Sequence, residues 1–303
     1  MPQTENDKNG LAKFFSDFFD NFGKFFIANI FFDIPLLIFG GLIFLFSYLN
    51  STINIFICFL LIPLMSPFFA GAFYICRKIA ADQPINPVKD FFKGIKDNWK
   101  FFLINSVILY AIVSGLWVTF GFYRDNLDNP MIIAALVFSV IFTLYFAFME
   151  FLIPVMAVSV ELKFIEILKN SVVLALGGFL NNLKTTLSLM LVASVIFTLF
   201  QATNNIIIGI VITGILLIVI LPIFCIYIIT FNSYKTVEKF VIKPYAEEHA
   251  EETRQQEREE AVSELDEDEL KKLANGNPDE FVFLNGRMLK RSAIQNMLKN
   301  KTK

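Results

Sequence analysis

Hydrophobic residues gather into six long runs along the chain, and short polar segments separate these runs. The runs cover residues 27–49, 53–76, 101–122, 131–160, 185–200 and 205–230. A helix needs about 20 largely apolar residues to cross the hydrocarbon core of a bilayer. The pattern therefore predicts an all-α, polytopic membrane protein, in which residues 27–245 form a domain of six transmembrane helices.

The polar segments beside these runs show the spacing of amphipathic helices. In residues 1–26 a polar start precedes an apolar face made of Leu11, Phe14, Phe15, Phe18, Phe19, Phe22, Phe25 and Phe26. Such a stripe is typical of a helix that lies in the plane of the membrane surface. Asn86-Pro87 joins a capping side chain to a proline suited to a first helical turn, so a second helix is expected to begin there. Gly177-Gly178 predicts a helix break within residues 161–184.

The helix expected after Pro87 has a basic face. Its polar positions hold Lys89, Lys93, Lys96 and Lys100. These lysines could bind anionic lipid headgroups, which is the interpretation we favour, or they could form a docking surface for a cytoplasmic partner.

The basic residues also predict an orientation in the membrane. The chain carries 26 lysines and arginines, and 16 of them precede residue 247. In the six-span arrangement only Arg124 of these falls on one side, and all the others fall on the opposite side. Because cytoplasmic loops are enriched in lysine and arginine, we predict a multi-pass protein of the cell (cytoplasmic) membrane with both termini in the cytoplasm.

The six runs form three similar pairs. Lys24, Lys100 and Lys184 stand at the start of the three pairs, and Ile62-Pro63, Ile153-Pro154 and Leu221-Pro222 lie in their second runs. Asn29 and Asn105 each lie five residues past their lysine. The pattern favours three parallel helical hairpins over a chance likeness among phenylalanine-rich segments.

Residues 246–303 differ in composition from the rest. Residues 247–269 are strongly acidic and predict a solvated helix or a disordered segment. Asn285-Gly286 then separates two short apolar stretches, which predicts a β-hairpin. We therefore expect a small acidic cytoplasmic tail whose hairpin docks on the membrane domain or on a partner, since an isolated hairpin is marginally stable in water.

The chain shows none of the familiar signatures of catalysis or metal binding. Its single histidine, His249, lies in the acidic segment, and Cys58, Cys76 and Cys225 have no metal-ligand spacing. We expect no enzymatic activity, no cofactor, no metal and no nucleic-acid partner.

Two acidic residues within the apolar runs are the candidates for an intramembrane polar site. Glu150 lies 13 residues before Lys163, which places it near mid-membrane, and Asp33 lies nearer one end of the first run, on the helical face of Asn29. Ionisable groups inside a bilayer are costly and often functional. Alternatively, each acid pairs with Asn105, a tyrosine or a backbone group freed by a proline. For Asp33 we favour the structural interpretation, and for Glu150 the two interpretations are evenly balanced.

A resemblance to a known family rests on features spread over residues 20–240. They are Asn29, Pro63 with Ser66 and Ala70, Tyr74 with Lys78, Phe92 followed by Lys96-Asp97-Asn98-Trp99-Lys100, and the segment from Tyr145 to Pro154. On these features the chain resembles the YesL-like family of bacterial membrane proteins, although Ser66-Pro67 departs from the expected turn. The tail is not part of that pattern.

The resemblance implies six-span inner-membrane proteins associated with carbohydrate uptake and breakdown, and it transfers no catalytic residue. The leading expectation is an accessory component of a carbohydrate transport system or another membrane complex, with transporter subunits or a second copy of the chain as partners. The alternative is a small transporter or channel built around Glu150.

Overall fold

The structure is a computed structural model that describes residues 10–49, 55–202, 205–245 and 247, and in the C-terminal part residues 275–278, 280–284, 287–291 and 295. The chain divides into two units, Met1–Phe240 and Val241–Lys303. The helices of the first unit are α1 (Gly10–Asp20), α2 (Phe22–Leu49), α3 (Ile55–Phe59), α4 (Leu61–Ala80), α5 (Pro87–Arg124), α6 (Pro130–Ser159), α7 (Phe164–Gly177), α8 (Phe179–Ala202), α9 (Ile206–Val219) and α10 (Leu221–Val237), which continues into the π-helical turn Glu238–Ile242.

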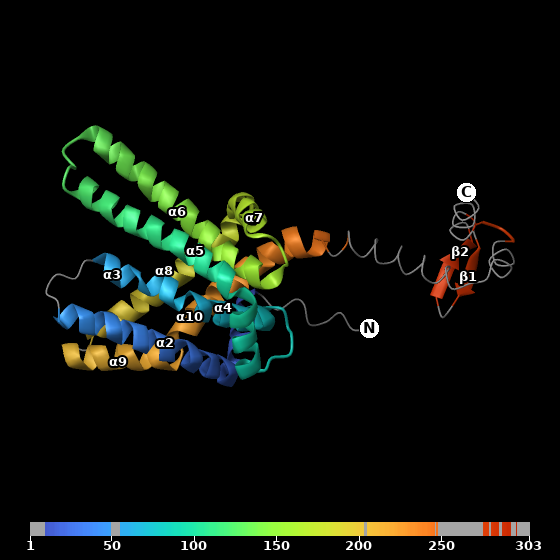
Figure 1. The fold of residues 1–303 in the computed structure, drawn as a ribbon, viewed down its shortest axis with the longest axis horizontal. Coiled ribbons are helices and arrows are strands. Elements are labelled where there is room, and N and C mark those ends of the chain that lie inside the picture. The colour runs from blue at the N-terminus through green and yellow to red at the C-terminus, as the bar shows by residue number, and fades with distance from the viewer. Residues whose placement is uncertain are drawn as a thin grey trace. The chain divides into compact units, whose positions relative to one another are not determined.

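Several of these helices have the length and composition of membrane spans. Within the described residues they are Phe22–Phe46, Ile55–Ala80, Pro87–Arg124, Pro130–Ser159 and Phe179–Ala202, and the pair Ile207–Leu216 and Leu221–Tyr245 adds a sixth if its two parts, bent by 51°, form one span. Figure 1 shows α5 and α6 side by side as a long hairpin, with α2 running beside α9. The structure thus has five or six apolar helices that fit a multi-pass membrane protein.

Helix boundaries follow local chemistry where the sequence supplies a clear signal. Asn86 caps α5, its side chain accepting a hydrogen bond from the Lys89 N–H at 3.1 Å, and Pro87 occupies the first turn. Gly178 ends α7, and α8 begins at the next residue. Both boundaries were predicted from the sequence.

Three boundaries differ from the sequence-based expectation. Helix α8 begins at Phe179, so Lys184 lies within it rather than ahead of the fifth run. The basic amphipathic segment and the third apolar run are one uninterrupted helix, α5, because the change from polar to apolar residues at Phe101 involves no residue that breaks a helix. The first span helix, α2, begins at Phe22, so Lys24 lies within its first turn rather than ahead of it.

Breaks in the second and sixth runs lie just ahead of prolines. A proline lacks an N–H and leaves the carbonyl four residues earlier without its helical partner. One helix is interrupted at Leu60, before Pro63, and another at Ile220, before Pro222. Pro67 lies within α4, where the Ser66 hydroxyl donates to the freed Pro63 carbonyl at 2.8 Å, and the helix continues.

The buried core of the first unit lies at one end of the helices. It comprises one face of α1, the start of α2 and α8, most of α4, the first half of α5, the second half of α6, and α7 and α10. Toward the other end, large apolar side chains such as Phe44, Phe138 and Phe197 are more than half exposed. Extensive exposed apolar surface marks contact with a membrane or another protein, and helices are the usual way of spanning a bilayer.

Helices α4 and α5 approach each other closely through glycines. A Cβ atom on Gly94 would lie 2.5 Å from the Tyr74 Cβ and 3.0 Å from the Ala70 carbonyl oxygen, and one on Gly71 would lie 2.8 Å from the Phe91 carbonyl oxygen. Small residues let helix backbones approach closely, and such contacts are common between membrane helices.

Helix α1 packs one aromatic face on α10. Phe14 stacks on Tyr227 with ring centroids 5.0 Å apart, and Phe18 meets Phe224 at 5.0 Å. Leu11 and Phe19 on the outer side are exposed. This two-sided arrangement agrees both with packing on the domain and with a position at the membrane surface.

The second unit contains two short strands, β1 (Phe281–Leu284) and β2 (Arg287–Lys290). They pair antiparallel, with Phe281 opposite Lys290 and Leu284 opposite Arg287. Their pairing is that of the predicted hairpin, whose turn residues Asn285 and Gly286 lie outside the described residues. The acidic segment 247–269, Glu247 excepted, and His249 lie outside them too.

Candidate intramembrane polar sites

Glu150 meets Asn105 across the α5–α6 hairpin. The Asn105 side-chain amide donates to Glu150 Oε2 at 3.0 Å. Glu150 lies one helical turn before Pro154, which does not interrupt α6. Asn105 is one of the partners that the structural interpretation of Glu150 names, and it gives the acid a polar partner on the neighbouring helix.

Asn29 forms a second polar site with the break between α9 and α10. It is fully buried, and its amide donates to the Ile218 carbonyl at 2.9 Å while its side-chain oxygen accepts from the Ile223 N–H at 3.1 Å. Ile218 is the residue whose carbonyl Pro222 leaves without a helical partner, four positions on. Asn29 of α2 therefore satisfies backbone groups on both sides of the break.

Asp33 lies one turn beyond Asn29 on α2 and is 3% exposed. The Asn29 amide also donates to Asp33 Oδ2. The other carboxyl oxygen, Oδ1, is buried and has no hydrogen-bond partner among the described residues. The sequence placed Asn29 and Asp33 on one helical face, but it did not name Asn29 as the partner of Asp33 and did not indicate that Asp33 Oδ1 would lack a partner among the described residues.

The four lysines of the basic face lie on the first four turns of α5. Lys89, Lys93, Lys96 and Lys100 are all exposed. The ammonium of Lys93 lies 5.9 Å from the centre of the Tyr74 ring, and that of Lys100 lies 5.7 Å from the Trp99 ring. Their side chains form no ion pair with another described residue, so their charges are available to an anionic surface.

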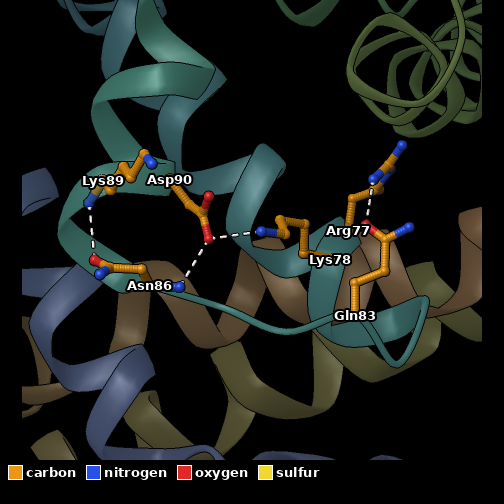
Figure 2. A network of polar contacts seen from close by, with 6 residues as sticks. All are labelled: Arg77, Lys78, Gln83, Asn86, Lys89 and Asp90. Carbon is orange, nitrogen blue, oxygen red and sulfur yellow. Dashed lines mark hydrogen bonds and ion pairs between the residues drawn. The ribbon is translucent and has the colours of Figure 1, made fainter.

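A polar network that the sequence did not reveal holds the turn between α4 and α5. Figure 2 shows the Asp90 carboxylate between the Lys78 ammonium, at 2.7 Å, and the Asn86 backbone N–H, at 2.8 Å. Asp90 and Lys78 are both largely buried. Arg77 donates to the Gln83 side chain at 2.9 Å in the same turn. The spacing of Asn86 and Asp90 marks a helix start, but the role of Lys78 depends on tertiary packing.

Outside the spans, charged groups tie α1 to its neighbours. Lys13 pairs with Asp82 at 2.7 Å, and the Tyr227 hydroxyl donates to Asp17 at 3.3 Å. Burial raises the pKa of Asp17, although Lys13 and the Tyr227 hydroxyl oppose that shift. For Lys13, burial acts to lower the pKa, but the bond and charge of Asp82 outweigh it and leave the pKa raised.

Comparison with known proteins gives no relative: no family model, no curated protein and no solved structure matches the chain. In the described part of the chain, no three His, Cys, Asp or Glu side chains come together as a metal site would require. The resemblance to the YesL-like family stays a prediction. The fold is helical, and its five or six long apolar helices fit a multi-pass membrane protein.

Proposed function

We propose that the protein is a six-span integral membrane protein of the cytoplasmic membrane, with α9 and α10 as one bent span and both termini in the cytoplasm. The distribution of charge on the helices supports this topology. In residues 10–245, every lysine and arginine except Arg124 lies in α1 or α7, in a connection, or in the part of a longer helix that is next to the buried core. Such an excess is the usual mark of the cytoplasmic side.

Cysteine labelling tests the topology. In a variant without the three native cysteines, Gln83→Cys would report on the α4–α5 turn and Leu127→Cys on the α5–α6 turn. A membrane-impermeant thiol reagent should label Leu127→Cys in intact cells and Gln83→Cys only after permeabilisation. The reverse pattern, or equal labelling of both, would refute the proposed orientation.

Within that topology, the proposed role is that of a non-enzymatic accessory component of a membrane complex, and the family resemblance makes a carbohydrate transport system the proposed setting. The observation that carries this role is the basic face of α5, with four exposed lysines that have no acidic partner among the described residues. Charged groups steer association and favour a partner of opposite charge. The accessory role takes the docking alternative for these lysines rather than lipid binding, so the proposed partner surface is acidic and cytoplasmic.

Purification from native membranes under mild conditions tests this role. We expect a stable partner to accompany the wild-type protein and to be lost from Lys93→Glu/Lys96→Glu. Lys163→Glu/Lys169→Glu is the matched control, because both residues are exposed at the α7 segment, and this variant should retain the partner. Recovery of the wild-type protein alone would count against the accessory role, as would equal loss of the partner from both variants.

A small transporter is the second candidate. The observation that favours it is the broken span α9–α10 beside a buried acid, because discontinuous helices commonly form the binding sites of membrane transporters. Asp33 is a stronger candidate for such a site than Glu150, because Asp33 lies beside the break and its Oδ1 has no partner among the described residues, whereas Glu150 lies in the uninterrupted helix α6. If liposome flux is unchanged in Glu150→Gln and lost in Asp33→Asn, the site lies at the break.

A further inference from the structure

The side-chain amide of Asn29 connects the helix break between α9 and α10 to the acidic side chain of Asp33 through hydrogen bonds. The two hydrogens of the Asn29 amide serve Asp33 Oδ2 and the Ile218 carbonyl, and its oxygen holds the Ile223 N–H. Asp33 and the backbone of the sixth span are therefore two hydrogen bonds apart. A change of charge on Asp33 thus acts on the Asn29 side chain, which is hydrogen-bonded to the backbone on both sides of the break.

The surroundings of Asp33 leave a negative charge uncompensated. The carboxyl group is 3% exposed, about 13 Å along α2 from Lys24 at 1.5 Å per residue. No ion pair with a described residue reaches it. An ionised carboxylate in an apolar setting is very costly unless it is paired, and a single neutral amide does not supply the missing charge.

The titratable and charged groups on the helices packed against α2 do not supply a compensating positive charge for Asp33 either. On α10 the Tyr227 hydroxyl bonds to Asp17 of α1, and on α4 the Cys76 thiol lies 4.0 Å from the Ile223 carbonyl. Asp90 of α5 is paired with Lys78 of α4, Lys13 of α1 is paired with Asp82, and α9 carries no titratable residue. The remaining groups on these helices are Asp20, Tyr74, Arg77, Lys89, Lys93, Lys96, Asp97, Lys100, Tyr110, Tyr123, Arg124, Cys225, Tyr234 and Lys235, and none forms a hydrogen bond or ion pair with Asp33.

The oxygens at this site favour a proton over a metal ion as the missing positive charge. Asp33 Oδ2, the Ile218 carbonyl and the Asn29 side-chain oxygen each already take part in a hydrogen bond. Asp33 Oδ1 alone has none among the described residues. Hard metal ions require several oxygen ligands at once, whereas a proton requires one.

We propose that Asp33 is a proton-binding site that controls how firmly Asn29 holds the α9–α10 break. A proton taken from water binds Oδ1, which leaves a neutral carboxyl group whose Oδ2 still accepts from Asn29. Loss of that proton to water leaves a buried charge, which draws water toward the site and weakens the bonds of Asn29 to the break. The inference rests only on the membrane location of α2 and is independent of the accessory role.

Infrared spectroscopy of the full chain in lipid nanodiscs tests proton binding directly. At neutral pH the wild type should show the carbonyl band of a protonated carboxylic acid, and Asp33→Asn should lose that contribution. Glu150→Gln is the matched control and should keep it. Asp33→Glu retains a carboxyl group and should shift the frequency of this band. This second variant tests proton binding at the site even if Asp33→Asn fails to fold. A spectrum that neither Asp33 variant changes would overturn the proposal.

Hydrogen exchange at Ile223 tests the coupling to the break. After correction for intrinsic exchange, protection of this amide should fall about fivefold as the pH rises and Asp33 loses its proton, the size expected for the loss of one hydrogen bond. Asp33→Asn should remove the change. If protection in the wild type instead responds to replacement of sodium by choline at constant pH, the occupant is an alkali-metal ion and the proton proposal fails. Cysteine labelling tests the topology separately, so the two failures are distinguishable.

Discussion

Replacement of Gly94 by alanine should loosen the close contact between α4 and α5. The added methyl group would lie 2.5 Å from the Tyr74 Cβ and 3.0 Å from the Ala70 carbonyl oxygen. Neither atom can move aside by rotation of a side chain, because one is a Cβ and the other belongs to the backbone. The helices must therefore separate for the methyl group to fit.

Gly115 on the same helix provides a matched control, because a Cβ there would meet nothing within 4 Å. Each Gly→Ala change gains about 1 kcal/mol in helix propensity. Overpacking of a well-packed core costs about 1–3 kcal/mol. Since the propensity gain is common to both variants, the free energy of unfolding of Gly94→Ala should lie about 1–3 kcal/mol below that of Gly115→Ala.

Unfolding by titration with a denaturing detergent, followed by helical circular dichroism in mixed micelles, measures this difference. Trp99 and Trp117 lie on α5 and give a second, local signal from their fluorescence. Both probes should show the same order of stability. If Gly94→Ala unfolds with the same free energy as Gly115→Ala, the close approach of α4 and α5 does not contribute as reasoned.

The same titration checks three further predictions. Glu150→Gln should remain within about 0.5 kcal/mol of the wild type, whereas Glu150→Leu should lose about 1–3 kcal/mol because Asn105 then lacks its partner; equal effects would contradict this. Asp90→Ala should lose about 1–3 kcal/mol by leaving a largely buried ammonium without its carboxylate, while Asp97→Ala, exposed on the same helix, should change stability by less than about 0.5 kcal/mol. Because burial raises the pKa of Asp17, the native state binds its proton more tightly than the unfolded chain does, so stability should fall as the pH rises from about 4 through the raised pKa. Asp17→Asn should remove that part of the pH dependence, and an unchanged profile would refute the assignment.

Helix boundaries with local causes could be predicted from the sequence. Asn86 and Pro87 begin α5 because a capping side chain and a proline suit a first turn, whatever the rest of the chain does. Gly178 ends α7 for a similarly local reason. The continuity of α5 was harder to see, because a change in hydropathy resembles a boundary although lysine, aspartate and phenylalanine are all compatible with a helix.

The partners of the intramembrane polar residues depend on the tertiary fold. Pro222 shows from the sequence alone that the Ile218 carbonyl loses its helical partner, but Asn29, which replaces that partner, lies 189 residues away. No periodicity or spacing links the two. The same limit applies to Asp33: its helical face was predictable, whereas the lack of a partner for Oδ1 follows from the packing of several helices around it.

Prolines in the spans leave backbone carbonyl groups without their helical hydrogen bonds. The result differs according to whether the replacement donor lies in the same helix or in another one. In α4 the carbonyl freed by Pro67 accepts from Ser66, a residue of the same helix, and the helix continues. At Pro222 the freed carbonyl accepts from α2, and the span bends by 51°. A bond supplied within one helix stays with that helix when it moves, whereas a bond supplied by a second helix breaks when the two separate. The bend in the sixth span is therefore the point at which movement of α2, or a change of charge on Asp33 beside Asn29, can alter the shape of another span.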